Sequence, residues 1–138
     1  MIFFRRRQTE TASALTGRWG EEAAARCLEQ KKYKLLGRRV RIGRRDEIDI
    51  VARLGEVLIF VEVKTRHGET FGRPSDSVDR KKRHALSRAA VRYIERLPNP
   101  RVRFRFDVVE VIGEPGCDPE VRHIENAFLL DKRYMLPC

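Results

Sequence analysis

The segment EIDIVARLGEVLIFVEVKTR, residues 47–66, constrains the fold more than any other part of this 138-residue chain. Its two apolar runs are separated by a leucine-glycine pair at 54–55, a pattern typical of two β-strands joined by a turn. The sequence therefore predicts a sheet built around this hairpin. The hairpin also contains charged residues where a buried strand would favour valine or isoleucine, namely Asp49, Glu62 and Lys64.

The charged residues of the hairpin are predicted to share one face of the sheet. With a two-residue turn at 54–55, Glu47 lies opposite Glu62, and Asp49 lies diagonal to Glu62 at roughly 7–8 Å. Because side chains alternate along a strand, Lys64 is on the same face. Two carboxylates on an apolar sheet repel each other and are costly to desolvate, and a divalent cation relieves both costs. Carboxylate oxygens suit Mg²⁺, so the pattern predicts a Mg²⁺ or Mn²⁺ site that could bind a phosphate and activate a water.

A plainer interpretation of this cluster is a salt-bridge patch at the rim of the sheet, since charge clusters are usually structural. Glu62 follows five consecutive apolar residues, which favours a buried environment over free solvation. A third acid, Glu21, lies at helical spacing from Ala24 and Leu28 and should tend toward the inner face of its helix. Its alternative is an early-helix acid favoured by the helix dipole.

The remaining elements predict an α/β domain. One helix is expected from an N-cap at Thr16 to about Tyr33, and a second over residues 77–97, where proline follows. Strands are expected within residues 38–45, as an edge strand, and over 101–112, in addition to the two of the hairpin. The order helix, three strands, helix, strand predicts a mixed central sheet flanked by helices.

A single domain accounts for most of the chain. Residues 1–15 lack periodicity and include three consecutive arginines, so we expect a flexible basic N-terminal arm, followed by one α/β domain over residues 16–138. The apolar segment NAFLL near the end of the chain gives no conformational prediction.

The charge balance points to a polyanionic partner. A net charge of +10 and a pI near 10.2 favour nucleic acid, most simply DNA. Arg66 and His67 directly follow the acidic hairpin. A polar stripe of the second helix could follow a phosphate backbone, although a solvated helix face is the commoner meaning of such a stripe. The stripe consists of Lys81, His84, Arg88 and Arg92.

Other sequence features predict a cytoplasmic protein. No apolar run approaches 18 residues, so we expect no membrane span. The apolar patch near the first residue is too short for a secretory signal. The three cysteines are widely spaced, which excludes a zinc motif and favours reduced thiols.

Several segments, taken together and in order, resemble a known family. The segments GRWGEEAAARCL, EIDIVA, LIFVEVKTR, FG and RFDVVEV are similar to those of the uncharacterised YraN-like proteins of bacteria. That family is placed in the PD-(D/E)XK nuclease superfamily, near the archaeal Holliday-junction resolvases. The resemblance covers residues 17 to about 112. It implies a restriction-endonuclease-like core and a metal-dependent endonuclease that acts on branched or structured DNA, with a homodimer possible because such resolvases work as dimers.

The resemblance also implies roles for individual residues. Asp49 matches the motif acid of the superfamily, Glu62 and Lys64 match its E-x-K, and Glu21 matches the helix acid of the G-x-x-G-E motif. The carbonyl of Val63 would be a further ligand of Mg²⁺ or Mn²⁺.

One residue departs from the family pattern, and the family pattern leaves activity open. The family usually reads Gly-Glu-Ile-Asp, whereas Asp46 replaces the glycine here, which could shift the start of the strand and adds negative charge near the site. Glu47 is expected beside Glu62 without binding the metal directly. Because a fold does not guarantee activity, the alternative is a non-catalytic nucleic-acid-binding protein that retains the nuclease fold.

Overall fold

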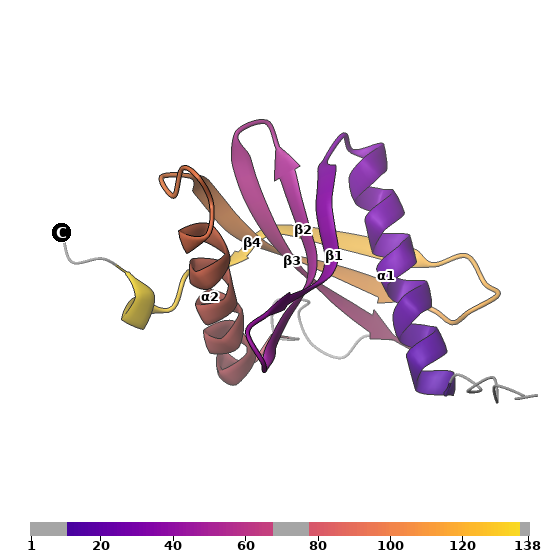
Figure 1. The fold of residues 1–138 in the computed structure, drawn as a ribbon. Helices are drawn as coiled ribbons and strands as arrows, with labels where there is room; N and C mark the ends of the chain where they lie inside the picture. Colours follow the sequence, from indigo (N-terminus) through magenta and orange to yellow (C-terminus); the bar gives the residue numbers. More distant parts are fainter. Residues whose placement is uncertain (1–10, 68–77, 136–138) are drawn as a thin grey trace, which may run out of the picture.

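The computed structural model describes residues 11–67 and 78–135, which form a five-stranded mixed sheet with α1 and α2 on either side (Figure 1). In chain order the elements are α1 (Ala12–Gln30), β1 (Lys34–Ile42), β2 (Asp46–Leu54), β3 (Val57–Arg66), α2 (Arg80–Glu95), β4 (Arg103–Ile112), β5 (Glu120–Phe128) and the short 3-10 helix η2 (Lys132–Tyr134). The predicted α/β class and the order of helix, three strands, helix and strand are confirmed.

The strands lie in the order β1-β2-β3-β4-β5, so β1 is an edge strand as predicted. β3 and β4 are parallel along their full length, and the other neighbouring pairs are antiparallel. The chain returns from β3 to β4 through α2, the connection that a parallel pair requires. The centre of the sheet is therefore β3, which carries the predicted E-x-K.

Each helix packs on its own side of the sheet because the side chains of the strands alternate. The α1 side buries Ala24, Ala25 and Leu28 together with Ile50, Ile59, Val61, Val109 and Val111. The α2 side buries Leu86, Ala89, Ala90 and Ile94 together with Val51, Phe60, Phe106 and Val108. No helix in the described ranges is long and apolar enough to cross a membrane.

The first helix begins earlier than predicted. Thr11 is its N-cap and accepts a hydrogen bond from the backbone N–H of Ala14 at 3.1 Å. The predicted cap, Thr16, is wrong: its hydroxyl instead donates to the carbonyl of Ala12 within the helix. The predicted basic arm therefore overlaps α1 at residues 12–15, and its first ten residues lie outside the described part of the chain.

The last strand is an addition to the predicted elements. β5 has alternating exposure and buries only its final residue, Phe128, because polar or charged side chains occupy five of its nine positions. A register shift opposite Asp107 and a left-handed φ of 51° at Asn126 interrupt the strand. The apolar segment NAFLL, whose conformation was not predicted, closes this strand and leads to η2.

Candidate active site

The β2–β3 hairpin turns at residues 55–56, one residue later than predicted. Ile50 pairs with Val61, which displaces the predicted register by two positions. Side chains repeat with a period of two, so the predicted faces are unchanged although the predicted partners are wrong. Continuing the observed register places Asp49 directly opposite Glu62 instead of diagonal to it. The two acids are therefore closer neighbours than the sequence indicated.

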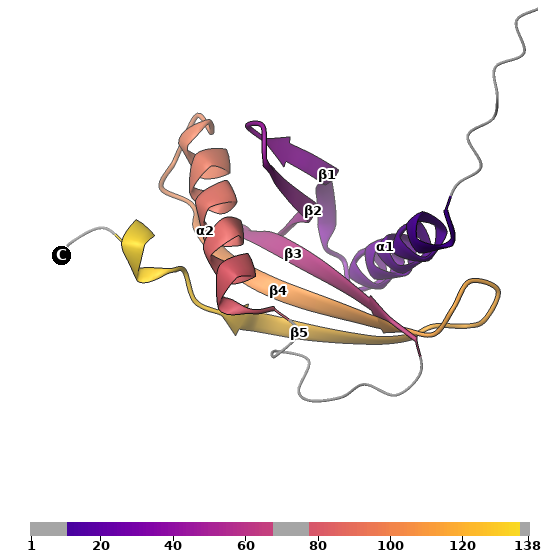
Figure 2. The same cartoon turned by 90° about the horizontal axis from the view of Figure 1, so that it is seen from below.

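The strands β1 and β2 change faces at the level of Asp49. Ile50 packs in the α1 cluster and Ile48 in the α2 cluster, although only Asp49 separates them, a spacing that places both side chains on one face of a regular strand. Opposite Asp49, between the register pairs of Arg38 with Ile50 and of Val40 with Ile48, lies Arg39 with a left-handed φ of 48°. The end of the β1–β2 hairpin that contains its turn consequently lies away from β3 and near α2 (Figure 2).

β2 pairs with β3 only from Ile50 onward along the chain. One residue before this pairing begins, the side chain of Asp49 accepts the hydrogen bond that a backbone carbonyl of β2 would otherwise accept from β3. The N–H of Val63 donates to Oδ2 of Asp49 at 2.9 Å. In an antiparallel ladder, the N–H and C=O of one residue point to the same side of the strand. The Val63 carbonyl therefore lies on the side of Asp49, as a shared cation site would require.

Asp49 and Glu62 form a pair of carboxyl groups on facing positions of β2 and β3. The side chain of Glu62 is buried and only 5% exposed, and Asp49 is half-buried. Burial, and then the charge of Asp49, raise the pKa of Glu62 to about 7. Burial also raises the pKa of Asp49, with a further contribution from the charge of Glu21. Near neutral pH, Glu62 is therefore partly protonated when no cation is bound.

Two lysines flank Glu62. Lys64 Nζ lies 3.8 Å from Glu62 Oε1, and Lys82 Nζ of the first turn of α2 lies 3.7 Å from the same oxygen. Sequence reasoning missed Lys82 as a site residue, although this lysine lies at helical spacing from the apolar Leu86 and Ala89, which α2 buries. A charged residue at this spacing was the available signal.

The third predicted acid, Glu21, is held by an arginine. Its side chain is 17% exposed, against 49% for Glu22, so it faces inward as predicted. Oε2 of Glu21 accepts a hydrogen bond from Nε of Arg39 at 2.7 Å. Glu47 is exposed and pairs in register with Arg41, so the prediction that it lies beside Glu62 is wrong.

The pair of acids, together with the Val63 carbonyl, suits a hard divalent cation. Within residues 11–67 and 78–135, no three His, Cys, Asp or Glu side chains are gathered closely enough to hold a metal ion by themselves. However, Oε2 of Glu62 is buried and has no hydrogen-bond partner among the described residues. A cation bound by Asp49 and Glu62 would replace the proton on Glu62. Mg²⁺ commonly completes its coordination shell with waters.

A cavity of about 620 Å³ lies beside the lysine of the E-x-K. Lys64 of β3 and the exposed His67, which directly follows β3, line one side of this cavity. Small residues of the first turns of α1 line the other side. Arg66 precedes His67, and its Nε is buried without a hydrogen-bond partner among the described residues. The cavity offers room for a substrate next to the paired acids.

The predicted basic stripe of α2 is only partly available to a partner. Lys81 and Arg92 are exposed. His84 Nδ1 lies 3.2 Å from Oδ2 of Asp131, so this ring already has an acidic neighbour. Arg88 donates two hydrogen bonds to Asp46, the residue that replaces the family glycine. The added negative charge of Asp46 is thus neutralised by α2.

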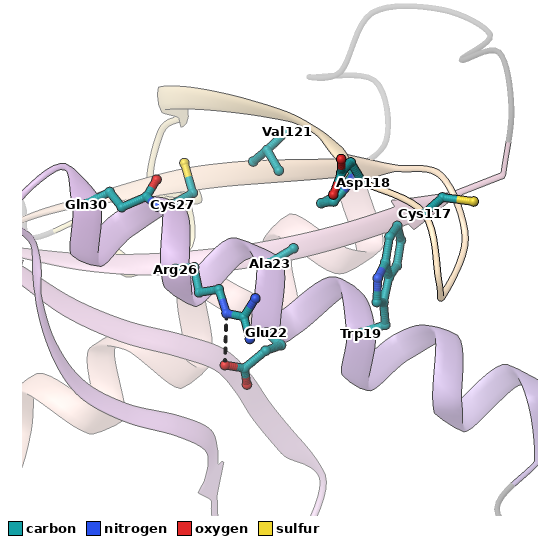
Figure 3. Close-up of a pocket in the computed structure, with 10 residues that line it drawn as sticks. Trp19, Glu22, Ala23, Arg26, Cys27, Gln30, Cys117, Asp118 and Val121 are labelled. Atoms are coloured by element: carbon teal, nitrogen blue, oxygen red, sulfur yellow. Dashed lines mark ion pairs between the residues drawn. The ribbon is translucent and has the colours of Figure 1, made fainter.

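A second cavity, of about 470 Å³, lies on the outward side of α1 against the β4–β5 connection. Figure 3 shows Trp19 beside Cys117 at one end and Cys27 at the other, and both thiols are free. Trp19 also packs against Gly113, where an added Cβ would lie 3.1 Å from the indole. Trp19 therefore packs between α1 and the β4–β5 connection.

The sequence of this chain is similar to those of one family of known proteins. Residues 20–111 match the profile of the uncharacterised protein family UPF0102. A UPF0102 protein of Symbiobacterium thermophilum is 46% identical over 118 residues, which cover 84% of this chain and 98% of that protein. A UPF0102 protein of Syntrophotalea carbinolica is 43% identical over 117 residues, covering 83% and 92% of the two chains. One of Parafrankia sp. is 43% identical over 112 residues, covering 81% and 94%.

Proposed function

Since the chain belongs to the uncharacterised protein family UPF0102, whose name assigns no activity, we propose its function from the site. We propose a metal-dependent endonuclease that hydrolyses phosphodiester bonds in branched or structured DNA. The observation that carries this proposal is the pair of facing carboxyl groups, Asp49 and the buried Glu62, at the centre of a basic domain. Few structural roles need two adjacent acids, one with a pKa raised by burial, beside two lysines.

Each residue of the site has a distinct task in this proposal. Asp49, Glu62 and the Val63 carbonyl would hold Mg²⁺ or Mn²⁺, which supplies charge stabilisation and a more acidic water. Lys64 lies at the 620 Å³ cavity, where its ammonium group can orient a water and offset phosphate charge. Lys82 adds a second positive charge from the α2 side. Glu21 is the third acid, available once its hydrogen bond to Arg39 opens.

The surface of the domain supports a DNA substrate. The net charge of +10 attracts polyanions, and Arg66 and His67 leave β3 beside the acids. Lys81 and Arg92 add exposed positive charge on α2. The resemblance to junction resolvases is the reason to name branched DNA in particular. Two symmetric strands of a junction call for two copies of the chain, so we propose a homodimer on such DNA, testable by sedimentation with and without a four-way junction.

The test of the proposal is cleavage of plasmid, single-stranded, flap and four-way-junction DNA with Mg²⁺ or Mn²⁺. We expect the wild-type chain to cut at least one of these, and Asp49→Asn and Lys64→Ala to lose about a hundredfold or more in rate, the usual scale for a group that stabilises a transition state. Matched controls are Glu56→Gln, an exposed acid at the opposite end of the hairpin, and Lys132→Ala, an exposed lysine of η2. Equal rates for wild type and Lys64→Ala on every substrate would refute the catalytic role.

A second candidate is a nucleic-acid-binding protein that no longer cuts. The observation that favours it is the Arg39–Glu21 hydrogen bond, which occupies the third acid. This candidate predicts salt-dependent DNA binding without Mn²⁺ uptake in calorimetry and without turnover. Arg66→Ala should then reduce the dependence of affinity on salt, because one phosphate contact is lost. Uptake of Mn²⁺ that Asp49→Asn abolishes would contradict it.

A further inference from the structure

Arg39 has a backbone conformation that an arginine adopts at a cost. Its φ of 48° lies in the left-handed region, within a strand, at the position where β1 and β2 change faces. Such a conformation is unfavourable for a non-glycine residue, whereas glycine would adopt it freely. Backbone strain of this kind is concentrated at functional sites. The fold needs the corner at this position, but the corner does not need an arginine.

The side chain of Arg39 explains what an arginine adds there. Its Nε–H donates to Glu21 at 2.7 Å, while its side chain remains 49% exposed. The hydrogen bond and charge of Glu21 raise the pKa of Arg39, and the charges of Glu47 and Asp49 add to this effect. Arg39 is thus the counterion of Glu21, whereas Lys64 and Lys82 pair with Glu62.

Arg39 also lines a small cavity beside the acids. This cavity, of about 200 Å³, lies between α1 and β1 and is lined by Arg18, Glu21, Glu22, Arg38 and Arg39. An arginine at its rim can turn toward a phosphate with little loss, since its forked N–H groups match phosphate as well as carboxylate. The geometry thus offers the guanidinium two alternative acidic partners, one within the chain and one outside it.

We propose that Arg39 is a positioning residue that exchanges partners, holding Glu21 in the free protein and a phosphate of the DNA backbone in the complex. The exchange releases Glu21 toward Asp49 and Glu62 only when DNA is present, so that the cation is bound most tightly in the complex. This inference rests on the proposed function for the identity of the cation and the polyanion. It explains why Glu21 lies near Asp49 without joining the Asp49–Glu62 pair in the DNA-free structure.

The proposal makes opposite predictions for the two ligands of Arg39→Gly. In calorimetry without DNA, we expect this variant to bind Mn²⁺ about tenfold more tightly than the wild type, because one nearby positive charge is lost and Glu21 is free. With a labelled four-way junction in EDTA, we expect weaker binding and a dependence on salt reduced by about one released counterion. Arg39→Lys keeps the charge but lacks the Nε–H, and should lie between the two for both ligands.

A purely structural role for Arg39 gives a different pattern. Glycine relieves the strained φ, so a corner residue without a ligand role would leave both affinities unchanged and raise the thermal midpoint. Unchanged or weaker Mn²⁺ binding by Arg39→Gly, or unchanged junction binding, would overturn the proposal. Arg41→Ala, an exposed arginine two residues along β1, is the charge-matched control and should leave Mn²⁺ binding near the wild-type value. A wild-type chain that cuts nothing, while Arg39→Gly shows both shifts, would remove the nuclease proposal and leave the exchange intact.

Discussion

Arg88 donates hydrogen bonds to both carboxylate oxygens of Asp46, with Nε 2.8 Å from Oδ2 and Nη2 2.7 Å from Oδ1. This forked pair joins the first residue of β2 to the middle of α2, and the side chain of Asp46 is only 4% exposed. The hydrogen bonds from Arg88, which outweigh the opposing effect of burial, lower the pKa of Asp46. The pair thus ties the turned end of the β1–β2 hairpin to the helix that also supplies Lys82.

Removing Arg88 should destabilise the domain. Arg88→Ala leaves the buried carboxylate of Asp46 without its hydrogen bonds, which costs on the order of 2 kcal/mol for a charged group. Asp46→Gly in the same chain removes the unpaired acid and should recover part of the loss. Urea unfolding at pH 7 measures both. Lys81→Ala, an exposed residue of the same helix, should change the free energy of unfolding by less than about 0.5 kcal/mol.

The pH dependence of stability should report the proton on Glu62. Its folded pKa of about 7 exceeds the ordinary value of 4.5, so the folded state binds a proton that the unfolded state has lost between these values. The stabilisation from this proton is therefore fully present below pH 4.5 and is lost as pH rises through 7, by on the order of 3 kcal/mol at about 1.4 kcal/mol per unit of pKa difference. In EDTA, Glu62→Gln should lose less stability than the wild type between pH 5 and pH 8. Identical pH profiles for Glu62→Gln, the wild type and the exposed-acid control Glu56→Gln would contradict this expectation.

The two glycines of α1 should respond in opposite ways to alanine. An added Cβ at Gly20 would clash with the Thr65 hydroxyl oxygen, whereas one at Gly17 meets nothing within 4 Å. Gly20→Ala should destabilise the domain by about 1–3 kcal/mol through overpacking, and it should displace the end of β3 that follows Lys64. Gly17→Ala should stabilise it by up to about 1 kcal/mol through helix propensity. Thermal unfolding of the two variants compares the positions within one helix.

Asp107, a buried acid of β4, should contribute strongly to the stability of the domain. Burial alone would raise the pKa of Asp107, but hydrogen bonds from His123, Arg105 and the backbone of Asn126 outweigh it and hold the pKa below its usual range. Asp107→Asn should cost about 3 kcal/mol at pH 7, because charged and polar partners are left unpaired in a buried position.

The pH and control experiments for Asp107 follow from the same contacts. Because the folded pKa is lowered, this stabilisation is present above the unfolded value of 3.8 and is lost as pH falls through the folded pKa. Glu120→Gln removes an acid that also pairs with an arginine, Arg122, but the two side chains are 60% and 45% exposed. It should cost less than about 1 kcal/mol. An equal loss for both acids would show that the network around Asp107 adds nothing beyond a surface pair.

The sequence predicted the faces of the central strands better than it predicted their partners. Alternation alone placed Asp49, Glu62 and Lys64 together, and a turn displaced by one residue did not change that result because the register moved by two. β5 was missed because its charged side chains conceal the alternation and a bulge interrupts it.

The roles of Lys82 and Arg39 depend on contacts that no local pattern specifies. Lys82 reaches Glu62 because α2 returns across β3, which is a matter of topology. The left-handed φ of Arg39 breaks the alternation on which reading a strand from sequence depends. Sequence periodicity therefore fails at the same corner where the structure brings the third acid and its counterion together.

The hydrogen bond from the Val63 amide to Asp49 gives the site its own spectroscopic probe. In most strands an amide proton reports only on the neighbouring backbone, but this one senses the carboxylate that would bind a cation. Its nitrogen-15 resonance should move as the acids titrate, and again when Mg²⁺ is added. One backbone signal can thus follow protons and metal in solution, independently of any DNA substrate or any cleavage assay.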